Sequence, residues 1–170
     1  SKGAEKICIN TSMIERPEVI TEVSETFGAQ AVVVSIDFKR NWRGRYETYI
    51  RCGSKSVSRY PVDLAQEMEA LGAGEILINS IEQDGTQSGY DIDLIKQVSE
   101  AVTVPVIACG GAGSKEDLAE GLKSGQASAV AAGSLFVFHG RRRGVLINFP
   151  SKEDRQWIYH KAGSMYENSD

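Results

Sequence analysis

The sequence predicts an α/β fold built around parallel strands. Three apolar segments, over residues 31–37, 76–79 and 104–109, each run into polar or glycine residues. Segments with the apolar spacing of helices separate them along the chain. In parallel α/β folds the carboxyl ends of the strands meet at one edge of the sheet and carry the functional side chains. The same pattern therefore predicts the fold class and the edge where a site should lie.

Five strands are predicted, because short runs of β-branched and aliphatic residues recur between the helical segments. They span residues 5–10, 31–36, 76–79, 104–108 and 129–132. We expect all five to run parallel, since helical segments lie between them. A small antiparallel hairpin is expected after the second strand, with its turn at residues 41–44 and its return strand at 45–52.

Helices are predicted where apolar residues share a face and capping residues mark the ends. They run over 18–27, from Pro61 to Gly72, from Asp91, from Ser114, and from Ser151 to about His160. In the first helix Val19, Val23 and Phe27 form the apolar face. We expect a helical turn over 134–138 and a frayed tail over 167–170.

Composition limits the class of protein. The chain has 170 residues, of which 41% are apolar and 25% charged, as is ordinary for a single globular domain over residues 1–170. No stretch approaches the roughly 18 apolar residues that span a membrane, and no signal peptide is visible. Three cysteines without paired spacing and two distant histidines predict a cytoplasmic protein without disulfides or a metal site. The net charge of -4 argues against general nucleic-acid binding.

Two parallel architectures fit this order of elements: an open doubly wound sheet, and part of an eight-stranded barrel. An internal sequence repeat favours the barrel. The residue pattern over 3–11 recurs over 126–134 with similar residue types, so the first and last strands look like copies of one unit.

The loop Gly110–Gly113 joins a predicted strand to the helix that Ser114 caps. Glycines let backbone N–H groups approach an anion closely, and a helix start attracts negative charge. The next strand is followed by Gly133 and Ser134, and in barrels the loops after the last two strands commonly form one phosphate site. A packing turn of small residues is the alternative, but the two loops together favour phosphate binding. The glycines do not fit the spacing of dinucleotide-binding loops.

Candidate catalytic and binding residues lie at the other strand ends. Asp37 ends a wholly apolar strand, where a carboxylate is costly unless it is used or paired, so we favour a catalytic role over a structural one. The residue types over 84–86 also favour a tight turn, so a purely structural role is the alternative for this segment. The further candidates are polar or glycine residues at the same edge of the predicted sheet: Asn10, Thr11, Ser80, Glu82, Asp84, Gly85 and Thr86.

A basic cluster follows Asp37. From Lys39 to Arg59 there are seven basic residues and one acid, Glu47, and a second basic run occupies 141–143. For any single arginine a solvated loop is the ordinary explanation. Because the first cluster directly follows a strand end of the functional type, we expect it as a whole to contact an anionic small molecule.

Four motifs in a fixed order resemble one family. They are residues 3–11, 32–37, 76–91 and 110–113, and the resemblance covers about residues 2–138. The sequence resembles the cyclase subunit of imidazole glycerol phosphate synthase, an enzyme of histidine biosynthesis. The resemblance implies a (βα)8 barrel, of which this chain would hold about five strands, the fourth to the eighth. It also implies that no metal or organic cofactor is needed.

The resemblance implies roles for the candidate residues. A glutamine amidotransferase partner would supply ammonia to a bis-phosphorylated ribulosyl nucleotide, giving imidazole glycerol phosphate and an aminoimidazole carboxamide ribotide. By position, Asp37 would be catalytic, and Lys6 and Glu75 would gate an ammonia channel on the barrel floor. Substrate contacts would come from Asn10, Thr11, Ser80, Asp84, Gly85 and Thr86. One phosphate would be held by Gly110, Gly111, Gly133 and Ser134.

The sequence departs from the family pattern at its start. A whole barrel has about 250 residues, so we expect roughly 80 residues to be missing, together with the other catalytic aspartate of the family. The chain alone is therefore expected not to be a competent cyclase. Asn79, Glu82 and Cys109 replace the Thr, Asp and Ser that are usual in the family.

Two further hypotheses remain open. Residues 140–150 resemble cyclase-like paralogues paired with sugar amidotransferases, in which the barrel would deliver ammonia for surface-polysaccharide synthesis. Alternatively, a half barrel with two unpaired edges and an exposed apolar face could be a non-catalytic fragment that self-associates.

Overall fold

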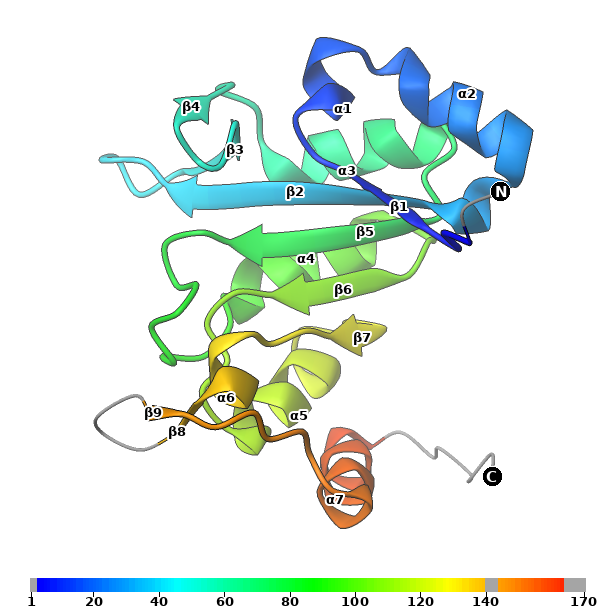
Figure 1. The fold of residues 1–170 in the computed structure, drawn as a ribbon. Coiled ribbons are helices and arrows are strands. Elements are labelled where there is room, and N and C mark those ends of the chain that lie inside the picture. The colour runs from blue at the N-terminus through cyan, green and yellow to red at the C-terminus, as the bar shows by residue number, and fades with distance from the viewer. Residues whose placement is uncertain (1–2, 140–143, 164–170) are drawn as a thin grey trace.

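The computed structural model describes residues 3–139 and 144–163 and has an open, mostly parallel sheet (Figure 1). Neighbouring parallel strands are, in spatial order, β1 (Ile7–Ile9), β2 (Val32–Arg40), β5 (Glu75–Ser80), β6 (Val106–Cys109) and β7 (Ala129–Val130). Their carboxyl ends point to the left in Figure 1. The prediction of five parallel strands is confirmed, and the arrangement is that of a partial (βα)8 barrel.

The expected hairpin is also present. β2 continues to Arg40 and pairs antiparallel with β3 (Tyr46–Ile50), which pairs in turn with β4 (Lys55–Ser56). The turn lies where it was predicted, and the Gly44 N–H donates to the Asn41 carbonyl oxygen at 2.8 Å. A separate two-stranded ladder joins β8 (Phe138–His139) to β9 (Gly144–Val145), which the sequence did not indicate.

The helices follow the predicted order. Those predicted are α2 (Glu18–Phe27), α3 (Pro61–Ala70), α4 (Ile92–Ala101), α5 (Lys115–Lys123), the turn α6 (Ser134–Val137) and α7 (Lys152–Ala162). The short α1 (Ser12–Glu15) and the 3-10 turn η1 (Ala29–Ala31) were not predicted. Asp91, Ser114 and Ser151 cap α4, α5 and α7 as predicted. None of the helices in the described part of the chain has the length and hydropathy needed to cross a membrane.

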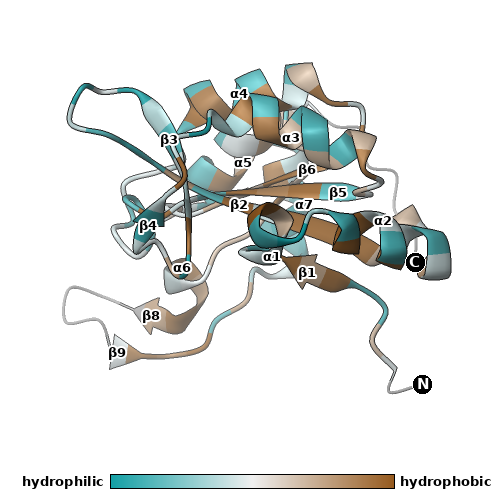
Figure 2. Ribbon diagram, turned by 90° about the horizontal axis from the view of Figure 1, so that it is seen from above, coloured by the Kyte–Doolittle hydropathy of each residue, from teal (hydrophilic) through white to brown (hydrophobic). Residues whose placement is uncertain are grey.

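The core lies between the sheet and the helices on one of its faces. Figure 2 shows α3 and α4 on one side of the sheet, and α5 contacts β7. Every second residue of the long strands points to this side, so Val34, Ile36 and Phe38 are buried. They meet a helix layer that includes Leu64, Met68, Leu94, Ile95 and Val98. Full burial of each such side chain contributes about 1.5–3 kcal/mol.

The intervening residues form the opposite face, which the described chain covers only in part. The register places Asp37 beside Asn79, and Asn79 beside Cys109. One layer deeper, Leu77 lies between Ser35 and Ile107. These side chains are half-buried, in contrast to the fully buried row on the other face. In a closed barrel this row would line the interior.

Several boundaries differ from the predictions for physical reasons. β2 extends beyond Ile36 because residues 37–40 pair with β3. The alternating polar residues of this segment did not indicate in the sequence that the strand continues. In α2 the predicted apolar face is wrong at its end: Ile20 is buried, whereas Phe27 is 63% exposed. The predicted tail 167–170 and basic run 141–143 lie outside the described residues.

The approach of η1 to the start of β5 requires a glycine at position 74. A Cβ there would lie 2.1 Å from the carbonyl oxygen of Ala29. We therefore expect Gly74→Ala to lower the free energy of unfolding by about 1–3 kcal/mol, measured by chemical denaturation. Gly133→Ala is the control, because a Cβ at that position has no atom within 4 Å. Equal stabilities of the two variants would contradict this account.

Candidate functional site

A carboxylate held by two amides lies at the carboxyl ends of three adjacent strands. Asp37 Oδ1 accepts a hydrogen bond from Asn79 Nδ2 at 2.9 Å. Asp37 Oδ2 accepts one from Asn10 Nδ2 at 3.2 Å, and the same nitrogen donates to the Ser35 carbonyl oxygen at 2.9 Å. Neighbouring strands thus orient both oxygens. The half-buried side chain remains accessible at the edge of the sheet where the parallel strands end, which we call the mouth. An oriented carboxylate of this kind can act as a general acid or base.

Two acceptors on residues next to the glycine loop 110–113 have no hydrogen-bond partner in the described structure. They are the buried Asn79 Oδ1 and Gln83 Oε1. A buried acceptor without a donor is costly, so such atoms often mark places where a ligand or water donates. Nothing in the sequence indicated Gln83, whereas Asn79 stands at the polar end of its predicted strand and departs from the family pattern.

The loop after β6 requires its glycines. Gly110 and Gly111 have φ angles of +85° and +114°. A Cβ on Gly110 would lie 2.5 Å from the Ser80 carbonyl oxygen, and one on Gly111 would lie 2.0 Å from the carbonyl oxygen of Gly89. The Gly89 N–H donates to the Gly111 carbonyl oxygen at 2.9 Å, which ties the loop after β5 to the loop after β6.

The start of α6 joins these loops. A Cβ on Gly85 would lie 3.7 Å from Ser134 Oγ, so the loop after β5 also faces the segment after β7. Gly133 is exposed and borders open space. The four residues predicted to hold phosphate therefore lie in two segments that both border the loop after β5.

The predicted substrate residues fall into different environments. Ser80 is 3% exposed and belongs to the helix-facing row, whereas Asp84 and Thr86 are exposed. The segment 84–86 forms a turn in which Asp84 N–H donates to the Ser80 carbonyl oxygen at 2.9 Å and Thr86 Oγ1 donates to that of Gln83 at 2.6 Å. At the end of β1, Thr11 Oγ1 accepts from the Arg51 N–H at 3.1 Å, which fastens this strand end to the hairpin.

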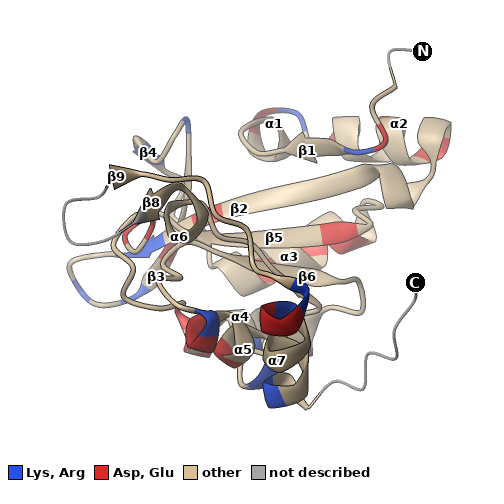
Figure 3. Ribbon diagram, turned by 60° about the horizontal axis from the view of Figure 1, so that its bottom comes forward, with Lys and Arg blue, Asp and Glu red and all other residues tan. Residues whose placement is uncertain are grey.

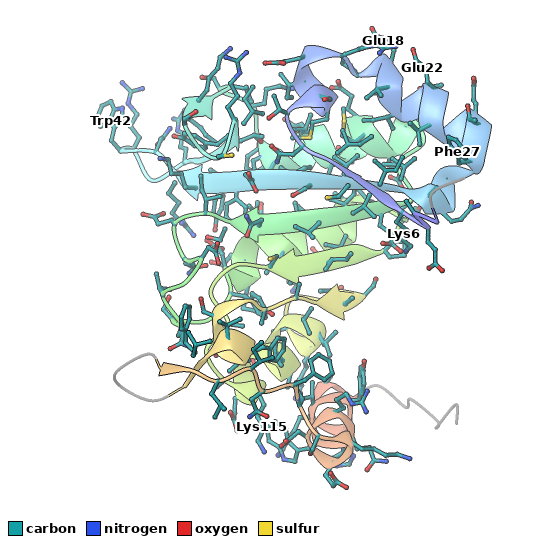
Figure 4. All side chains as sticks on the ribbon, viewed as in Figure 1. Lys6, Glu18, Glu22, Phe27, Trp42 and Lys115 are labelled. Carbon is teal, nitrogen blue, oxygen red and sulfur yellow. The ribbon has the colours of Figure 1, made fainter. Side chains whose placement is uncertain are left out.

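Lys6 and Glu75, the pair predicted to gate an ammonia channel, lie at the opposite end of the sheet. Lys6 Nζ and Glu75 Oε1 form an ion pair between the segment before β1 and the start of β5. In Figure 4 Lys6 lies at the far end of the sheet from Trp42, which marks the hairpin tip. Figure 3 shows charged positions at these amino-terminal strand ends.

The structure divides the basic cluster into groups with different partners. Arg40, Arg51 and Arg59 form ion pairs with Asp91, Glu15 and Glu67. Arg43 and Arg45 line an open hollow of about 490 Å³ beside the hairpin, together with Asn41, Tyr46, Glu47, Ser58, Arg59 and Tyr60. Lys39 instead lies above the Tyr49 ring, 4.4 Å from its centroid.

The pKa values of two cysteine thiols on these strands are raised. Burial raises the pKa of the Cys109 thiol, and the carboxylates of Asp84 and Asp37 raise it further. Burial and Asp37 likewise raise the pKa of Cys8. Within residues 3–139 and 144–163, no group of three or more His, Cys, Asp or Glu side chains could hold a metal ion.

Known proteins resemble this chain over most of its length. The family model described as "Histidine biosynthesis protein" matches residues 1–142. The chain is 48% identical over 137 residues to "Imidazole glycerol phosphate synthase subunit HisF" of Alkaliphilus metalliredigens, covering 81% of this chain and 54% of that protein. It is 45% identical over 150 residues to "Putative imidazole glycerol phosphate synthase subunit hisF2" of Pseudomonas aeruginosa, covering 88% and 60%.

A third relative extends the alignment further. The chain is 42% identical over 161 residues to "Putative imidazole glycerol phosphate synthase subunit HisF" of Leptospira interrogans, covering 94% of this chain and 63% of that protein. The chain thus spans between 54% and 63% of the length of these curated relatives.

The electrostatic account of Cys109 can be tested by alkylation. Because the Asp84 carboxylate raises the pKa of Cys109, Asp84→Asn should lower that pKa and increase the thiolate fraction at about pH 8. We expect iodoacetamide to modify Cys109 severalfold faster in this variant, as measured by mass spectrometry of the alkylated peptide. Glu82→Gln is the control, since this exposed neighbour does not contribute to the shift. An unchanged rate in Asp84→Asn would contradict the assignment.

Proposed function

This chain belongs to the histidine biosynthesis protein family, and we propose on that basis that it carries the substrate-binding part of an imidazole glycerol phosphate synthase cyclase. The observation that most supports this is the Asp37 carboxylate, held by Asn10 and Asn79 at the mouth of a parallel sheet. The substrate would be a bis-phosphorylated ribulosyl nucleotide, and ammonia would be the nitrogen donor. The products would be imidazole glycerol phosphate and an aminoimidazole carboxamide ribotide.

In the proposed reaction Asp37 transfers protons at the reacting nitrogen and carbon atoms. Its two amide donors fix the orientation of the carboxylate, which allows it to act on protons of a bound substrate. The second acid of the family's pair has no counterpart in this chain, so we propose that turnover requires the N-terminal half of a barrel. Asn10, Thr11, Ser80 and the turn 84–86 would contact the substrate.

One phosphate of the substrate would bind where the glycine loops meet. Gly133 is exposed and borders open space, and Ser134 could donate its hydroxyl, whereas the buried Gly110 and Gly111 allow the loops after β5 and β6 to approach each other. Ammonia would come from a glutamine amidotransferase partner at the opposite end of the sheet. The Lys6–Glu75 pair, which joins two strand starts there, would gate its entry.

A second candidate function is ammonia delivery to a sugar amidotransferase in surface-polysaccharide synthesis. It is favoured by the C-terminal part of the chain. The alignment with the relative named hisF2 covers 150 residues and that with the Leptospira interrogans relative covers 161, against 137 for the Alkaliphilus metalliredigens protein. The chain would then use the same Lys6–Glu75 end and the same mouth of the sheet, but it would not cyclise a substrate.

A cyclisation assay tests the proposal and separates the two candidates. Turnover would be measured with ammonium ion, and in a parallel arm with glutamine and an amidotransferase, each with and without a supplied N-terminal half barrel. We expect activity only with that half, and a loss of about 10²- to 10⁴-fold in kcat for Asp37→Asn. Asp63→Asn, an exposed aspartate at the start of α3, is the matched control.

The outcomes of this assay are distinct. Turnover by the chain alone would refute the need for the N-terminal half. Substrate binding without turnover in either arm, with the half supplied, would favour ammonia delivery. Full activity in Asp37→Asn would remove the catalytic role of this carboxylate.

We also propose that the chain self-associates when it is not complemented. β1 and β7 lie at the two ends of the parallel sheet, and the half-buried row contains Leu77 and Ile107. Unpaired strand edges and accessible apolar side chains recruit other chains. Sedimentation velocity should therefore show dimers or larger species as concentration rises, and a strictly monomeric profile at high concentration would refute the proposal.

A further inference from the structure

The hollow beside the hairpin has no role in the proposed function. Its walls come from the hairpin turn, the start of β3 and the segment that leads into α3, and its volume is about 490 Å³. A volume of this size is typical of sites for small molecules. Its lining residues within the described chain include none of those predicted for catalysis, phosphate binding or the channel. The hollow is therefore separate from the mouth.

Hydrogen bonds hold the walls of the hollow in place. Asn41 Oδ1 accepts from the N–H groups of Arg43 and Arg45 at 2.9 and 3.0 Å, which fixes the hairpin turn. The Tyr46 hydroxyl donates to the Asp91 carboxylate at 2.7 Å, and Asp91 caps α4. The turn is thus closed on itself and β3 is tied to a helix start. A ligand would meet walls that are already ordered, which lowers the entropic cost of binding.

Two arginines of the hollow have no acidic partner. Arg59 forms an ion pair with Glu67, and Glu47 accepts from two uncharged side chains. Within the described residues Arg43 and Arg45 have no carboxylate oxygen within 4.0 Å. Three arginines and one glutamate line the hollow, in a chain whose net charge is -4. The hollow is therefore a local positive region on an acidic chain and attracts anions.

Aromatic rings lie beside these cations. Tyr46 and Tyr60 line the hollow, and the Tyr60 hydroxyl donates to Gln97. Trp42, at the hairpin tip between two lining residues, is 85% exposed (Figure 4). The Arg43 guanidinium lies 4.4 Å from the centroid of its ring. Guanidinium groups bind phosphate oxygens in a bidentate way, and aromatic rings stack on planar bases. A ligand that carries both a phosphate and a base would use both features.

We propose that this hollow binds a nucleoside phosphate, with the phosphate on Arg43 and Arg45 and the base against Tyr60. A lone phosphate group would leave most of the volume unfilled and the rings without a contact. A nucleic acid strand is disfavoured because the acidic remainder of the chain repels a long polyanion. The nucleotide would be a second ligand rather than a substrate, and its binding would not depend on catalysis by Asp37.

Calorimetric titration of the chain with AMP tests the proposal, with ribose 5-phosphate and adenosine as probes of its two parts. We expect AMP to bind more tightly than either part. Arg45→Met should weaken AMP binding about tenfold or more. Arg45→Lys should restore only part of the affinity, because it keeps the charge without the planar fork. Lys55→Met is the matched control, since it removes an exposed cation of β4 that does not line the hollow.

The contact with the base has a separate test. Tyr60→Leu should weaken AMP binding about fivefold or more and leave ribose 5-phosphate unaffected, whereas Tyr60→Phe keeps the ring and should bind AMP almost as the unaltered chain does. The sequence holds two tryptophans, so in a Trp157→Phe background the fluorescence of Trp42 reports on the hairpin tip. AMP should change that emission over the same concentration range as the calorimetric signal.

Several outcomes would overturn the inference. They are the absence of AMP binding by the unaltered chain at millimolar concentrations, an equal loss in Lys55→Met, and undiminished binding in the double variant Arg43→Met/Arg45→Met. Tighter binding of single-stranded oligoadenylate than of AMP would also overturn it, since the hollow would then be a nucleic-acid site. Far-ultraviolet circular dichroism of each variant separates loss of binding from loss of folding.

Discussion

The alternation of side chains along β2 sets which residues enter the core and which enter the candidate site. One row, including Ile36 and Phe38, packs against the helices, and the other carries Asp37 and Lys39 to the mouth. A shift of one residue in register would exchange the rows, burying a carboxylate and an ammonium group and exposing the core. The hydrophobic effect therefore fixes which polar residues can act, before any of them makes a specific contact.

Polar contacts between neighbouring strands then convert this row into a site. Asn10 and Asn79 come from the strands on either side of β2, and both donate to Asp37. The backbone link from Gly89 to Gly111 joins the loops after β5 and β6 in the same way. Because each contact joins different strands, the geometry of the mouth is coupled to the correct pairing of the whole sheet. The unpartnered oxygens of Asn79 and Gln83 are a cost that a bound ligand could offset.

The hairpin after β2 separates two kinds of positive charge. Arg40, Arg51 and Arg59 hold neighbouring elements together through acidic partners, and their exposed ion pairs contribute little individually. Lys39 lies over the Tyr49 ring, and Arg45 lines the hollow beside the hairpin. A cluster that looks uniform in the sequence is therefore partly structural and partly available to ligands.

Local patterns in the sequence were enough to predict the parallel α/β order, the caps at Asp91 and Ser114, the hairpin turn and the edge on which Asp37 lies. These features depend on local periodicity, turn chemistry and capping, all of which act over a few residues. The exposure of Phe27, the position of Ser80 on the helix-facing side and the contact of Lys39 with Tyr49 became clear from the folded structure alone. Those outcomes depend on strand pairing and on contacts between residues far apart in the chain, such as the carboxylate of Asp91 meeting Arg40. Local sequence patterns carry no record of such partners.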